Sequence, residues 1–323
     1  MENSPVSYKP TGFIGGAGHG CIFTAGSENY WKAATTSISV RHMCERRVSF
    51  YPSCFDKDGY LFTNTYLGDY PMFLPGGKEQ IAGEYQPGWM LLSYGKKVSV
   101  SSSLEGYPAE NIVDEDARTA WVAQSNRDME WAQVDLQRLS SIHAIQVNFD
   151  EYGANQKGAV SGVYQSYLIY ASVNGEDWSL VVDYGTKKTD TPHDYIEFEE
   201  PFKARYIKLQ NKEYMVSENF SVRDLRIFGK GQGSTPRAVN DFTVERDEAD
   251  PCKARLCWEA VPDAQGYIVR YGIAGDKLYN NFQVMGENTL EIGSLNKGVA
   301  YYFTIDAYNE NGITRTSRIK VCR

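Results

Sequence analysis

Histidine and cysteine are the residue types that most often bind metals or act as nucleophiles, and this chain of 323 residues contains four of the first and six of the second. The histidines lie far apart in the sequence, and no two cysteines have CxxC spacing. Zinc sites usually take their ligands from short, regular Cys and His spacings. The pattern therefore argues against a zinc cluster and against a disulfide framework. The histidines are His19, His42, His143 and His193.

Two short acidic motifs have the residue types needed for acid–base chemistry. Asp56 and Asp58 in FDKDGY form an acid pair, but Asp and Gly also favour the geometry of a hairpin turn. We interpret the motif as a turn. Asp69 in LGDYP is placed to reach a cleft or to cap a loop, and the cap is the favoured interpretation.

Composition and charge argue against several classes of protein. The formal net charge is −8 at pH 7 without a basic stripe, so nucleic-acid binding is not expected. No apolar run approaches the roughly 20 residues of a membrane-spanning helix. The residues after Met1 have neither the basic start nor the apolar segment of a signal peptide, so none is expected in this chain. The 23 tyrosines and recurrent Gly and Pro turns favour β-structure.

Amino-acid composition and the alternation of side chains divide the chain into three sections. Residues 1–95 are rich in glycine and aromatic residues, and residues 96–230 alternate between apolar and polar side chains. The stretch GKGQGSTPRAV has the composition of a flexible joint, which we place at residues 231–237. Residues 238–323 then form a compact third section.

The middle section predicts a sandwich of antiparallel strands. In AIQVNF, Ile145, Val147 and Phe149 face one way, as in a half-buried strand. YLIYASVNGEDWSLV predicts two strands joined by a turn at Asn174 and Gly175. The tryptophans expected in or near the core are Trp121, Trp131 and Trp178.

Five motifs of this section follow the order seen in discoidin domains, the coagulation factor 5/8 type C family, which includes carbohydrate-binding modules of family 32. The section resembles that family in PAENIVDEDARTAWVA, EWAQVDL, YLIYASVNGEDWSLV, ARYIKLQN and VRDLRIFG. The resemblance implies an eight-stranded jelly-roll. The terminal cysteine pair of the animal members is absent, which fits the bacterial branch better.

The third section resembles a fibronectin type III domain. RLCWEAVPDAQGYIVRYG places Leu256 and Trp258 inward on one strand, and Tyr267, Val269 and Tyr271 alternate on the next. Leu295 and Tyr301 have the spacing of a tyrosine corner, whose hydroxyl bonds to backbone upstream.

The same resemblance places two cysteines, Cys252 and Cys322, at one pole of a type III sandwich. Their pairing would close a loop of about 70 residues, stabilise the section by roughly 4 kcal/mol and imply export. The alternative is two free thiols. Cys257 is expected to point outward and to stay unpaired.

The first section resembles the C-terminal blades of family 43 glycoside hydrolases, which are five-bladed β-propellers. The matching motifs are GHGCIFTAGSENYW, SISVRHMCERRVSFYPSCFDKDGYLF and LGDYP. The family's three catalytic acids precede the GHG motif, and here the only acid before His19 is Glu2. No catalytic carboxylate is therefore expected in the matched residues. His19 matches a histidine that helps to hold a metal ion or water at the propeller axis; the alternative is a loop histidine bonded to backbone.

Two blades cannot close a ring and leave apolar faces uncovered. Residues 1–95 are therefore expected to dock on the missing N-terminal blades in trans, to pack against the discoidin-like section or to oligomerise.

The discoidin resemblance implies a sugar site in the loops at one end of the jelly-roll. Sugar recognition needs an aromatic face for the C–H side of the ring and planar polar groups for the hydroxyls. The alternative is that the tyrosines only cover the end of the sandwich. The candidate sugar-binding residues are Tyr107, Tyr152, Tyr164, Tyr214, Asn219 and Phe220.

The resemblance also implies a structural Ca²⁺ ion, because family members enclose one between an acidic loop and an acid near the last strand. Hard oxygen ligands suit calcium. Glu115 replaces the glycine of the family's loop and is expected to strain it; the alternative is an Asp-rich turn without metal. The candidate ligands are Asp114, Asp116, Thr119 and Asp224.

These patterns predict an all-β chain with partial β-propeller blades, a discoidin jelly-roll sandwich and a fibronectin type III sandwich. The predicted function is that of a non-catalytic, glycan-binding C-terminal portion of a polysaccharide-degrading hydrolase of family 43 type. Its ligand would be a polysaccharide or oligosaccharide, and its location extracellular, periplasmic or on a bacterial cell surface. The alternative is a stand-alone adhesion or interaction protein.

Overall fold

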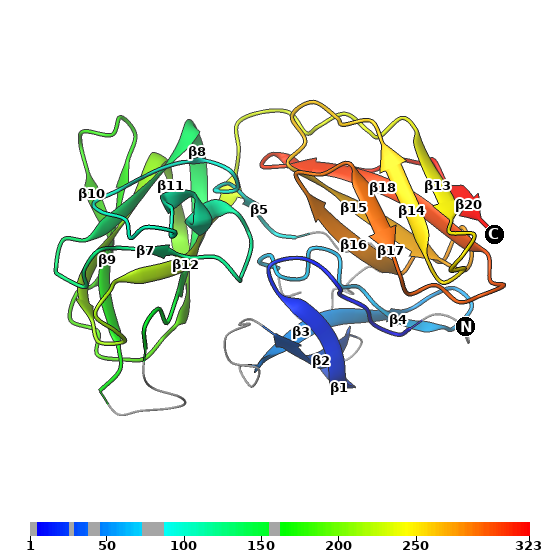
Figure 1. The fold of residues 1–323 in the computed structure, drawn as a ribbon, viewed down its shortest axis with the longest axis horizontal. Coiled ribbons are helices and arrows are strands. Elements are labelled where there is room, and N and C mark those ends of the chain that lie inside the picture. The colour runs from blue at the N-terminus through cyan, green and yellow to red at the C-terminus, as the bar shows by residue number, and fades with distance from the viewer. Residues whose placement is uncertain (1–4, 26–28, 38–45, 73–86, 155–161) are drawn as a thin grey trace. The chain divides into compact units, whose positions relative to one another are not determined.

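The computed structural model describes residues 5–25, 29–37, 46–72, 87–154 and 162–323 (Figure 1). The described residues are organised in strands, with one short 3₁₀ helix, so the protein is all-β. Among these residues, no helix has the length and apolar character needed to cross a bilayer. The chain divides into two compact units: one holds residues 89–233, and the other holds residues 1–88 with 234–323.

The unit of residues 89–233 is a jelly-roll sandwich whose strands follow the order β10-β9-β11-β8-β12-β5, with β6 paired to β8 and β7 to β12 (Figure 1). All pairs are antiparallel. The elements are β5 (Met90–Leu91), β6 (Lys97–Val100), η1 (Ala109–Val113), β7 (Trp121–Val122), β8 (Trp131–Phe149), β9 (Gln165–Ser172), β10 (Ser179–Tyr184), β11 (His193–Tyr214) and β12 (Ser221–Lys230).

Two long strands, β8 and β11, contribute to both faces of the sandwich. They pair along almost their whole length, with register shifts between residues 197 and 202 and between 204 and 206. Gln137 has a φ of 66°, a turn conformation inside β8. The first half of β8 pairs with β6 and the second half with β12. The apolar side chains of both faces therefore converge on one core.

The predicted strand at residues 145–149 is confirmed, because Ile145, Val147 and Phe149 are buried in that core. Asn148 is buried as well, and a hydrogen bond between its side chain and His193 at 3.0 Å compensates for the burial of this polar group. The predicted turn is also confirmed: Gly175 has a φ of 84°, between β9 and β10.

The predicted tryptophans differ in their burial. Trp121 is fully buried in the core. Trp131 and Trp178 are only half-buried. The ammonium group of Lys208 lies 4.0 Å from the ring centre of Trp178, so this indole packs on the surface of the sandwich.

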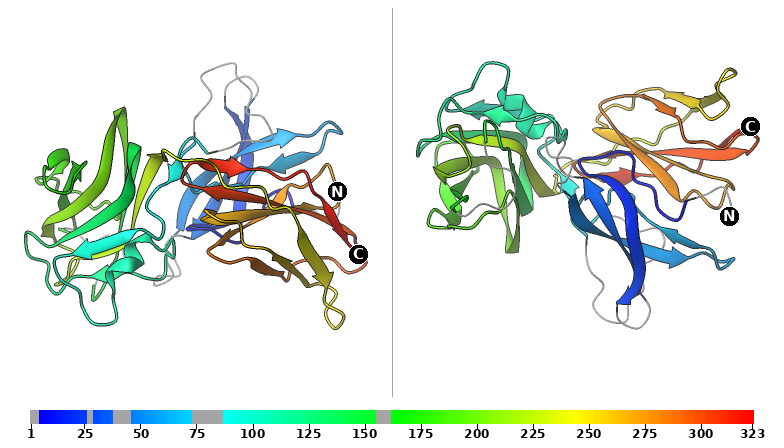
Figure 2. Two further views of the ribbon diagram at one scale, coloured as in Figure 1. Left: turned by 90° about the horizontal axis from the view of Figure 1, so that it is seen from above. Right: turned by 60° about the horizontal axis from the view of Figure 1, so that its bottom comes forward.

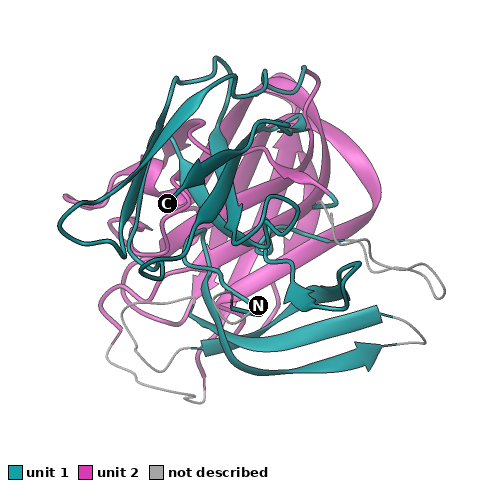
Figure 3. Ribbon diagram, turned by 90° about the vertical axis from the view of Figure 1, so that its right-hand side faces the viewer, with its two compact units in different colours: residues 1–88, 234–323 teal, residues 89–233 magenta. Residues whose placement is uncertain are grey.

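The other unit combines an N-terminal sheet with a C-terminal sandwich (Figure 2, Figure 3). The sheet is an antiparallel meander of β1 (Gly15–Ala25), β2 (Asn29–Ser37), β3 (Arg46–Phe55) and β4 (Leu61–Thr63). The sandwich has a three-stranded sheet, β13-β14-β17, and a five-stranded sheet, β16-β15-β18-β19 with β20. Its strands are β13 (Phe242–Arg246), β14 (Ala254–Trp258), β15 (Gly266–Gly272), β16 (Asn280–Met285), β17 (Thr289–Ile292), β18 (Tyr301–Asn309), β19 (Gly312–Thr314) and β20 (Lys320–Cys322).

The side chains predicted to face the core of this sandwich do so. Leu256 and Trp258 on β14 are buried, as are Tyr267, Val269 and Tyr271 on β15.

The tyrosine corner is present too, because the backbone N–H of Asn296 donates to the hydroxyl of Tyr301 at 3.2 Å. This bond fixes the loop before β18 to the strand.

The N-terminal sheet packs on the outer face of the five-stranded sheet. Phe62 stacks on Tyr279 with ring centres 3.9 Å apart, and Asn281 donates to Thr65 at 3.0 Å. In each view, the blue sheet and the orange strands of the sandwich lie side by side (Figure 1, Figure 2). The C-terminal sandwich of the same chain was not among the three expected partners of this section, yet it covers one of its faces.

Two acidic motifs of the N-terminal section behave as expected. Asp56 accepts the backbone N–H groups of Asp58 and Tyr60 at 2.9 and 2.8 Å, so FDKDGY is a turn. Asp69 accepts the N–H of Phe13 at 2.8 Å and therefore caps a loop.

The pairing of Cys252 with Cys322 is not present in the structure: both are free thiols. Cys322 is buried in the core of the sandwich, whereas Cys252 is exposed in the turn before β14. The two side chains therefore lie in different environments. Cys257 is free as expected, and half-buried.

Candidate functional site

Backbone hydrogen bonds gather several loops at one end of the jelly-roll unit. Ala123 donates to the carbonyl of Phe220 at 2.8 Å, and Phe220 donates to that of Ser125 at 2.9 Å. Asp150 donates to Ser221 at 3.0 Å in the same way. Gln124 donates its backbone N–H to the hydroxyl of Ser102 at 3.0 Å. The segments 101–108, 123–130, 150–154 and 211–220 thus form one surface, which we call the loop end.

Two of the predicted aromatic residues meet at the loop end. Tyr107 and Tyr152 come from different loops, and their rings pack edge to face with centres 4.9 Å apart. Both side chains are half-exposed. Contact between the rings restricts their rotation, so the pair offers a preorganised aromatic surface to a ligand.

Three other candidates have structural roles, and their prediction as ligand contacts is not supported by their placement. Tyr214 and Phe220 are fully buried and pack together with ring centres 5.3 Å apart. The hydroxyl of Tyr214 donates to the carbonyl of Asp150. Asn219 donates to the carbonyl of Ala123 at 2.9 Å. Tyr214 and Asn219 hold the loops together because their side chains bond to backbone, and Phe220 does so by packing against Tyr214.

Tyr164 lies against a salt bridge. Its hydroxyl donates to Glu213 at 2.8 Å, and the ammonium group of Lys188 lies 4.3 Å from its ring centre. Lys188 and Glu213 also pair directly. One face of Tyr164 is therefore occupied by a side chain, which makes it a poorer stacking surface than Tyr107 or Tyr152.

Sequence reasoning missed a polar groove at the loop end. The groove has a volume of about 500 Å³ and is lined mainly by residues 124–130 with Ser101 and Ser102. Glu130 accepts hydroxyl protons from Ser102 at 2.8 Å and Ser125 at 2.7 Å, and from Ser101. Burial opposes ionisation of Glu130, but these hydroxyls outweigh it and lower its pKa. The run SNRDMEW was the available signal, because it is a polar loop directly before a strand.

The predicted calcium loop is organised around a buried ion pair. Glu115 has a φ of 59°, which explains why the family prefers glycine there. Arg226 binds both carboxylate oxygens of Glu115, at 2.7 and 3.0 Å, and both side chains are buried. The bidentate pair holds the loop against β12 and offsets the strain expected at Glu115.

Asp114 and Asp224, two of the three carboxylates among the predicted calcium ligands, influence each other. Burial and then the charge of Glu115 raise the pKa of Asp224 well above its usual value, and Asp114 adds to the shift. Thr119 donates to Asp114 at 2.7 Å, and Asp116 donates its backbone N–H to the same side chain at 2.9 Å. The oxygen donors suit calcium chemically. The described residues nevertheless contain no group of three or more Asp, Glu, His or Cys side chains arranged to bind a metal ion.

His19 occupies an exposed position on β1 with a φ of 44°. The neighbouring Gly20 lies so close to β2 that a Cβ atom there would stand 1.8 Å from the carbonyl oxygen of Ala33. The close approach of two strands therefore accounts for glycine at this position. The role of His19 at a propeller axis stays a prediction, and His42 lies outside the described residues.

Residues 97–224 match the family described as the F5/8 type C domain. These residues are an F5/8 type C domain. The match covers the jelly-roll unit from β6 to the middle of β12. It does not extend to the N-terminal sheet or the C-terminal sandwich, so the assignments made there stay predictions.

Curated relatives and solved structures were found for part of the chain. Lactadherin of Rattus norvegicus is 33% identical over 110 residues, which are 32% of this chain and 25% of lactadherin. The chain thus matches about a quarter of the length of this relative. Chitosan-binding module 2 from a chitosanase/glucanase of Paenibacillus sp. IK-5, in complex with chitotriose, is 20% identical with a TM-score of 0.37 and covers 43% of this chain and 99% of that chain. A family 32 carbohydrate-binding module from C. perfringens, in complex with galactose, is 18% identical with a TM-score of 0.35 and covers 43% of this chain and 98% of that one.

Proposed function

We propose that the F5/8 type C domain binds a glycan at its loop end. The observation that supports this most strongly is the contact between Tyr107 and Tyr152, which are brought together from separate loops and left half-exposed. An aromatic surface of this kind stacks on the C–H face of a sugar ring. The nearby groove supplies serine, glutamine and arginine side chains for hydroxyl groups.

Glycan binding is tested by glycan-array screening of the full chain, followed by calorimetry with the best ligand. Tyr152→Ala removes one half of the aromatic pair and is expected to weaken binding about tenfold. Tyr195→Ala is the matched control, because Tyr195 is exposed on β11 and pairs in register with Gln146, outside the loop end. Equal affinity of Tyr152→Ala and the unchanged protein would contradict the proposal.

A finer proposal concerns the protein to which this domain belongs. We infer from the sequence resemblances that it serves a polysaccharide-degrading hydrolase of family 43 type outside the cell, with a type III domain as a spacer. The consecutive order β1-β2-β3-β4 is compatible with a propeller blade. A screen of the purified chain on arabinosides and xylosides is expected to show no turnover, and hydrolysis would overturn the non-catalytic role.

A structural calcium ion is a separate proposal. Asp114 and Asp224 would hold it, with backbone carbonyls supplying further oxygen ligands, and the ion would neutralise the acidic loop. An increase in melting temperature on addition of CaCl₂, absent with MgCl₂, is the expected result. No change on addition of CaCl₂ would contradict it.

The alternative of an adhesion protein has one observation in its favour. Met129 and Met215 are 62% and 52% exposed at the loop end, and exposed methionines are common at protein-binding surfaces. A blank glycan array together with capture of a protein partner that Met129→Ser weakens would favour this function over glycan binding.

A further inference from the structure

The outer face of one sheet of the jelly-roll unit carries aromatic and basic side chains that no function assigned above uses. On β11, Ile207 and Leu209 are buried in the core, so Tyr206 and Lys208, which alternate with them, point away from it. Residues opposite each other on neighbouring strands share a face. The register therefore places one row of side chains across the outer face: Leu180 on β10, Tyr170 on β9, Lys208 on β11, Gln133 on β8 and Ser99 on β6.

This row changes in character along its length. Adjacent strands lie about 4.8 Å apart, so a row across five strands extends over about 19 Å. At one end Leu180 is 48% exposed beside Tyr170. At the other end Gln133 and Ser99 supply an amide and a hydroxyl group. A face of this length fits several consecutive rings of an extended ligand.

Two aromatic rings flank the ammonium group of Lys208. It lies 4.0 Å from the ring centre of Trp178 and 5.5 Å from that of Tyr170. The ring of Tyr206 packs edge to face with Trp178, with centres 6.5 Å apart, and restricts rotation of the indole. The rings attract a cation but carry no net charge. They therefore position the ammonium group without neutralising it.

Lys208 differs in this respect from its basic neighbours. Arg205 binds both carboxylate oxygens of Asp135, at 2.8 and 2.9 Å, and Lys212 pairs with Asp128. Lys208 forms no ion pair with a carboxylate of the described residues. Burial lowers the pKa of Lys208, whereas a nearby carboxylate would raise it. The centre of the row thus holds a positive charge that an anionic ligand can balance.

We propose that this face binds an extended acidic polysaccharide, with the carboxylate of one uronic acid at Lys208 and the following sugars along Gln133 and Ser99. The exposed parts of Trp178 and Tyr170 border the ring at Lys208. The lysine ammonium is a compact charge, which suits a carboxylate better than a sulfate ester with its more dispersed charge. The net charge of −8 disfavours a dense polyanion such as a nucleic acid.

This site goes beyond the glycan site at the loop end, because its side chains project from strands and require an acidic sugar. The first test measures, by calorimetry with the full chain, the affinity for oligogalacturonates in which most carboxylates are methyl-esterified. Lys208→Gln is expected to weaken binding about tenfold, and Lys208→Arg, which keeps the charge, to retain most of the affinity. Lys203→Gln is the matched control, because Lys203 is exposed on the same strand and pairs in register with Ser141, outside the row. Equal affinity of Lys208→Gln and Lys203→Gln would overturn the proposal.

The second test changes the ligand. The fully esterified oligogalacturonate of the same length is expected to bind the unchanged protein about tenfold more weakly, and to bind Lys208→Gln as well as the partly esterified one does. Equal binding of both ligands to the unchanged protein would overturn the role of the acid. Dextran sulfate that binds as tightly, with the same dependence on Lys208, would overturn the assignment to a carboxylate.

The third test distinguishes this face from other uses. Trp178→Ala is expected to weaken oligogalacturonate binding several-fold and to leave the mass measured by light scattering unchanged. A lower mass with unchanged affinity would overturn the proposal, because the face would then join two copies of the chain. Tyr152→Ala should leave oligogalacturonate binding unchanged, and Lys208→Gln should leave binding of the loop-end ligand unchanged. Failure of the loop-end site and failure of this site therefore give different results.

Discussion

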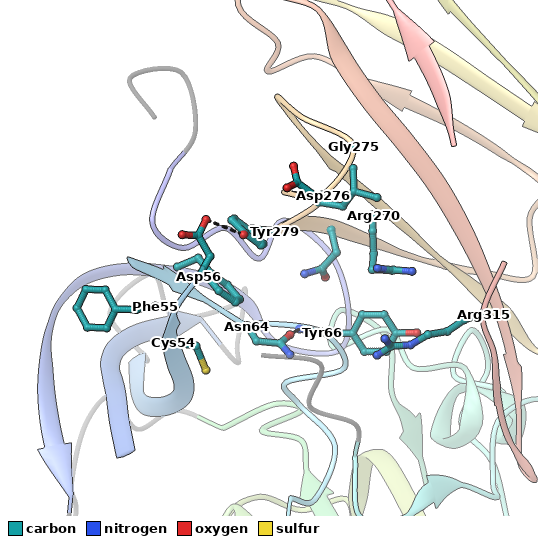
Figure 4. Close-up of a pocket in the computed structure, with 13 residues that line it drawn as sticks. Cys54, Phe55, Asp56, Asn64, Tyr66, Arg270, Gly275, Asp276, Tyr279 and Arg315 are labelled. Carbon is teal, nitrogen blue, oxygen red and sulfur yellow. Dashed lines mark hydrogen bonds between the residues drawn. The ribbon is translucent and has the colours of Figure 1, made fainter. Parts of the chain in front are cut away.

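Each unit buries a carboxylate against an arginine with two hydrogen bonds, but the surroundings of the two pairs differ. Arg226 and Glu115 in the jelly-roll unit have side-chain exposures of only 1% and 2%. Arg270 in the other unit is 20% exposed and lines a cavity, while its partner Asp306 is fully buried. The Arg226–Glu115 pair is sealed by packing and therefore fixes a loop. The Arg270–Asp306 pair has the same chemistry but borders a cavity between two sheets (Figure 4).

The sealed pair should show the largest effect when it is broken. Glu115→Gln leaves Arg226 buried without its counter-charge, and we expect a loss of about 3 kcal/mol in the free energy of unfolding of the jelly-roll unit. Urea denaturation followed by tryptophan fluorescence measures it. Lys57→Gln removes an exposed ion pair with Asp276 and should leave stability unchanged. An unchanged free energy of unfolding in Glu115→Gln would show that the pair does not hold the loop.

The second prediction tests whether the N-terminal sheet gains stability from the sandwich. Phe62 is 7% exposed and stacks on Tyr279, so Phe62→Ala should destabilise its unit by about 2 kcal/mol. Phe50→Ala on the same sheet is the control, because Phe50 is 51% exposed. Limited proteolysis should cut residues 1–72 faster only in Phe62→Ala. Identical behaviour of the two variants would show that this contact does not anchor the sheet.

The third prediction concerns Asp224 and is a gain in stability, whereas the first two are losses. A buried acid with a raised pKa in the folded state costs stability once the pH rises above its unfolded value, because the unfolded chain then ionises more easily. Asp224→Asn removes this cost, and its amide oxygen still accepts the N–H of Glu115.

We therefore expect Asp224→Asn to raise the melting temperature by roughly 2–4 °C at pH 7 in EDTA. The gain should shrink as the pH falls through the unfolded value of about 4 and vanish near pH 2, where Asp224 is protonated in both states. If the domain binds calcium, CaCl₂ should stabilise the original protein and not the variant. A lower melting temperature in EDTA would contradict the prediction. Differential scanning calorimetry at both pH values provides the measurement.

The sequence predicted the strands of the jelly-roll well because their side chains alternate with a period of two and only one face reaches the core. Ile145, Val147 and Phe149 illustrate this. The same pattern explains the failure at Tyr214 and Phe220. Both lie in or beside a loop, and a sequence does not reveal whether a loop aromatic faces solvent or caps the core.

Contacts between distant segments could not be predicted from the sequence either. Arg226 lies more than one hundred residues from Glu115, and Tyr279 more than two hundred from Phe62. No spacing rule joins such residues, because the approach depends on tertiary packing. The cavity could not be predicted for the same reason, since its two sides come from opposite ends of the chain.

The smallest expected effect concerns the rim of the cavity, where Asp56 joins the turn after β3 to Lys277 and Tyr279. Burial alone would raise the pKa of Asp56, but the ammonium of Lys277, the N–H of Tyr60 and the hydroxyl of Tyr279 outweigh it and hold the pKa well below its usual range. A lowered folded-state pKa contributes stability above the unfolded value of about 4, and this contribution is lost as the pH falls through that value towards the folded one.

Asp56→Asn should therefore reduce the melting temperature of its unit by only about 1 °C at pH 7, and the reduction should shrink as the pH falls from 4 to 2. The effect is small because Lys277 keeps Asp58 at 2.6 Å as a second counter-charge after the substitution. Calorimetry at pH 7, 4 and 2 measures the difference, with Asp276→Asn as the control for a carboxylate of the same rim. A loss at pH 7 as large as that of Glu115→Gln would show that the ion pair between Asp56 and Lys277 stabilises its unit as much as the sealed pair does.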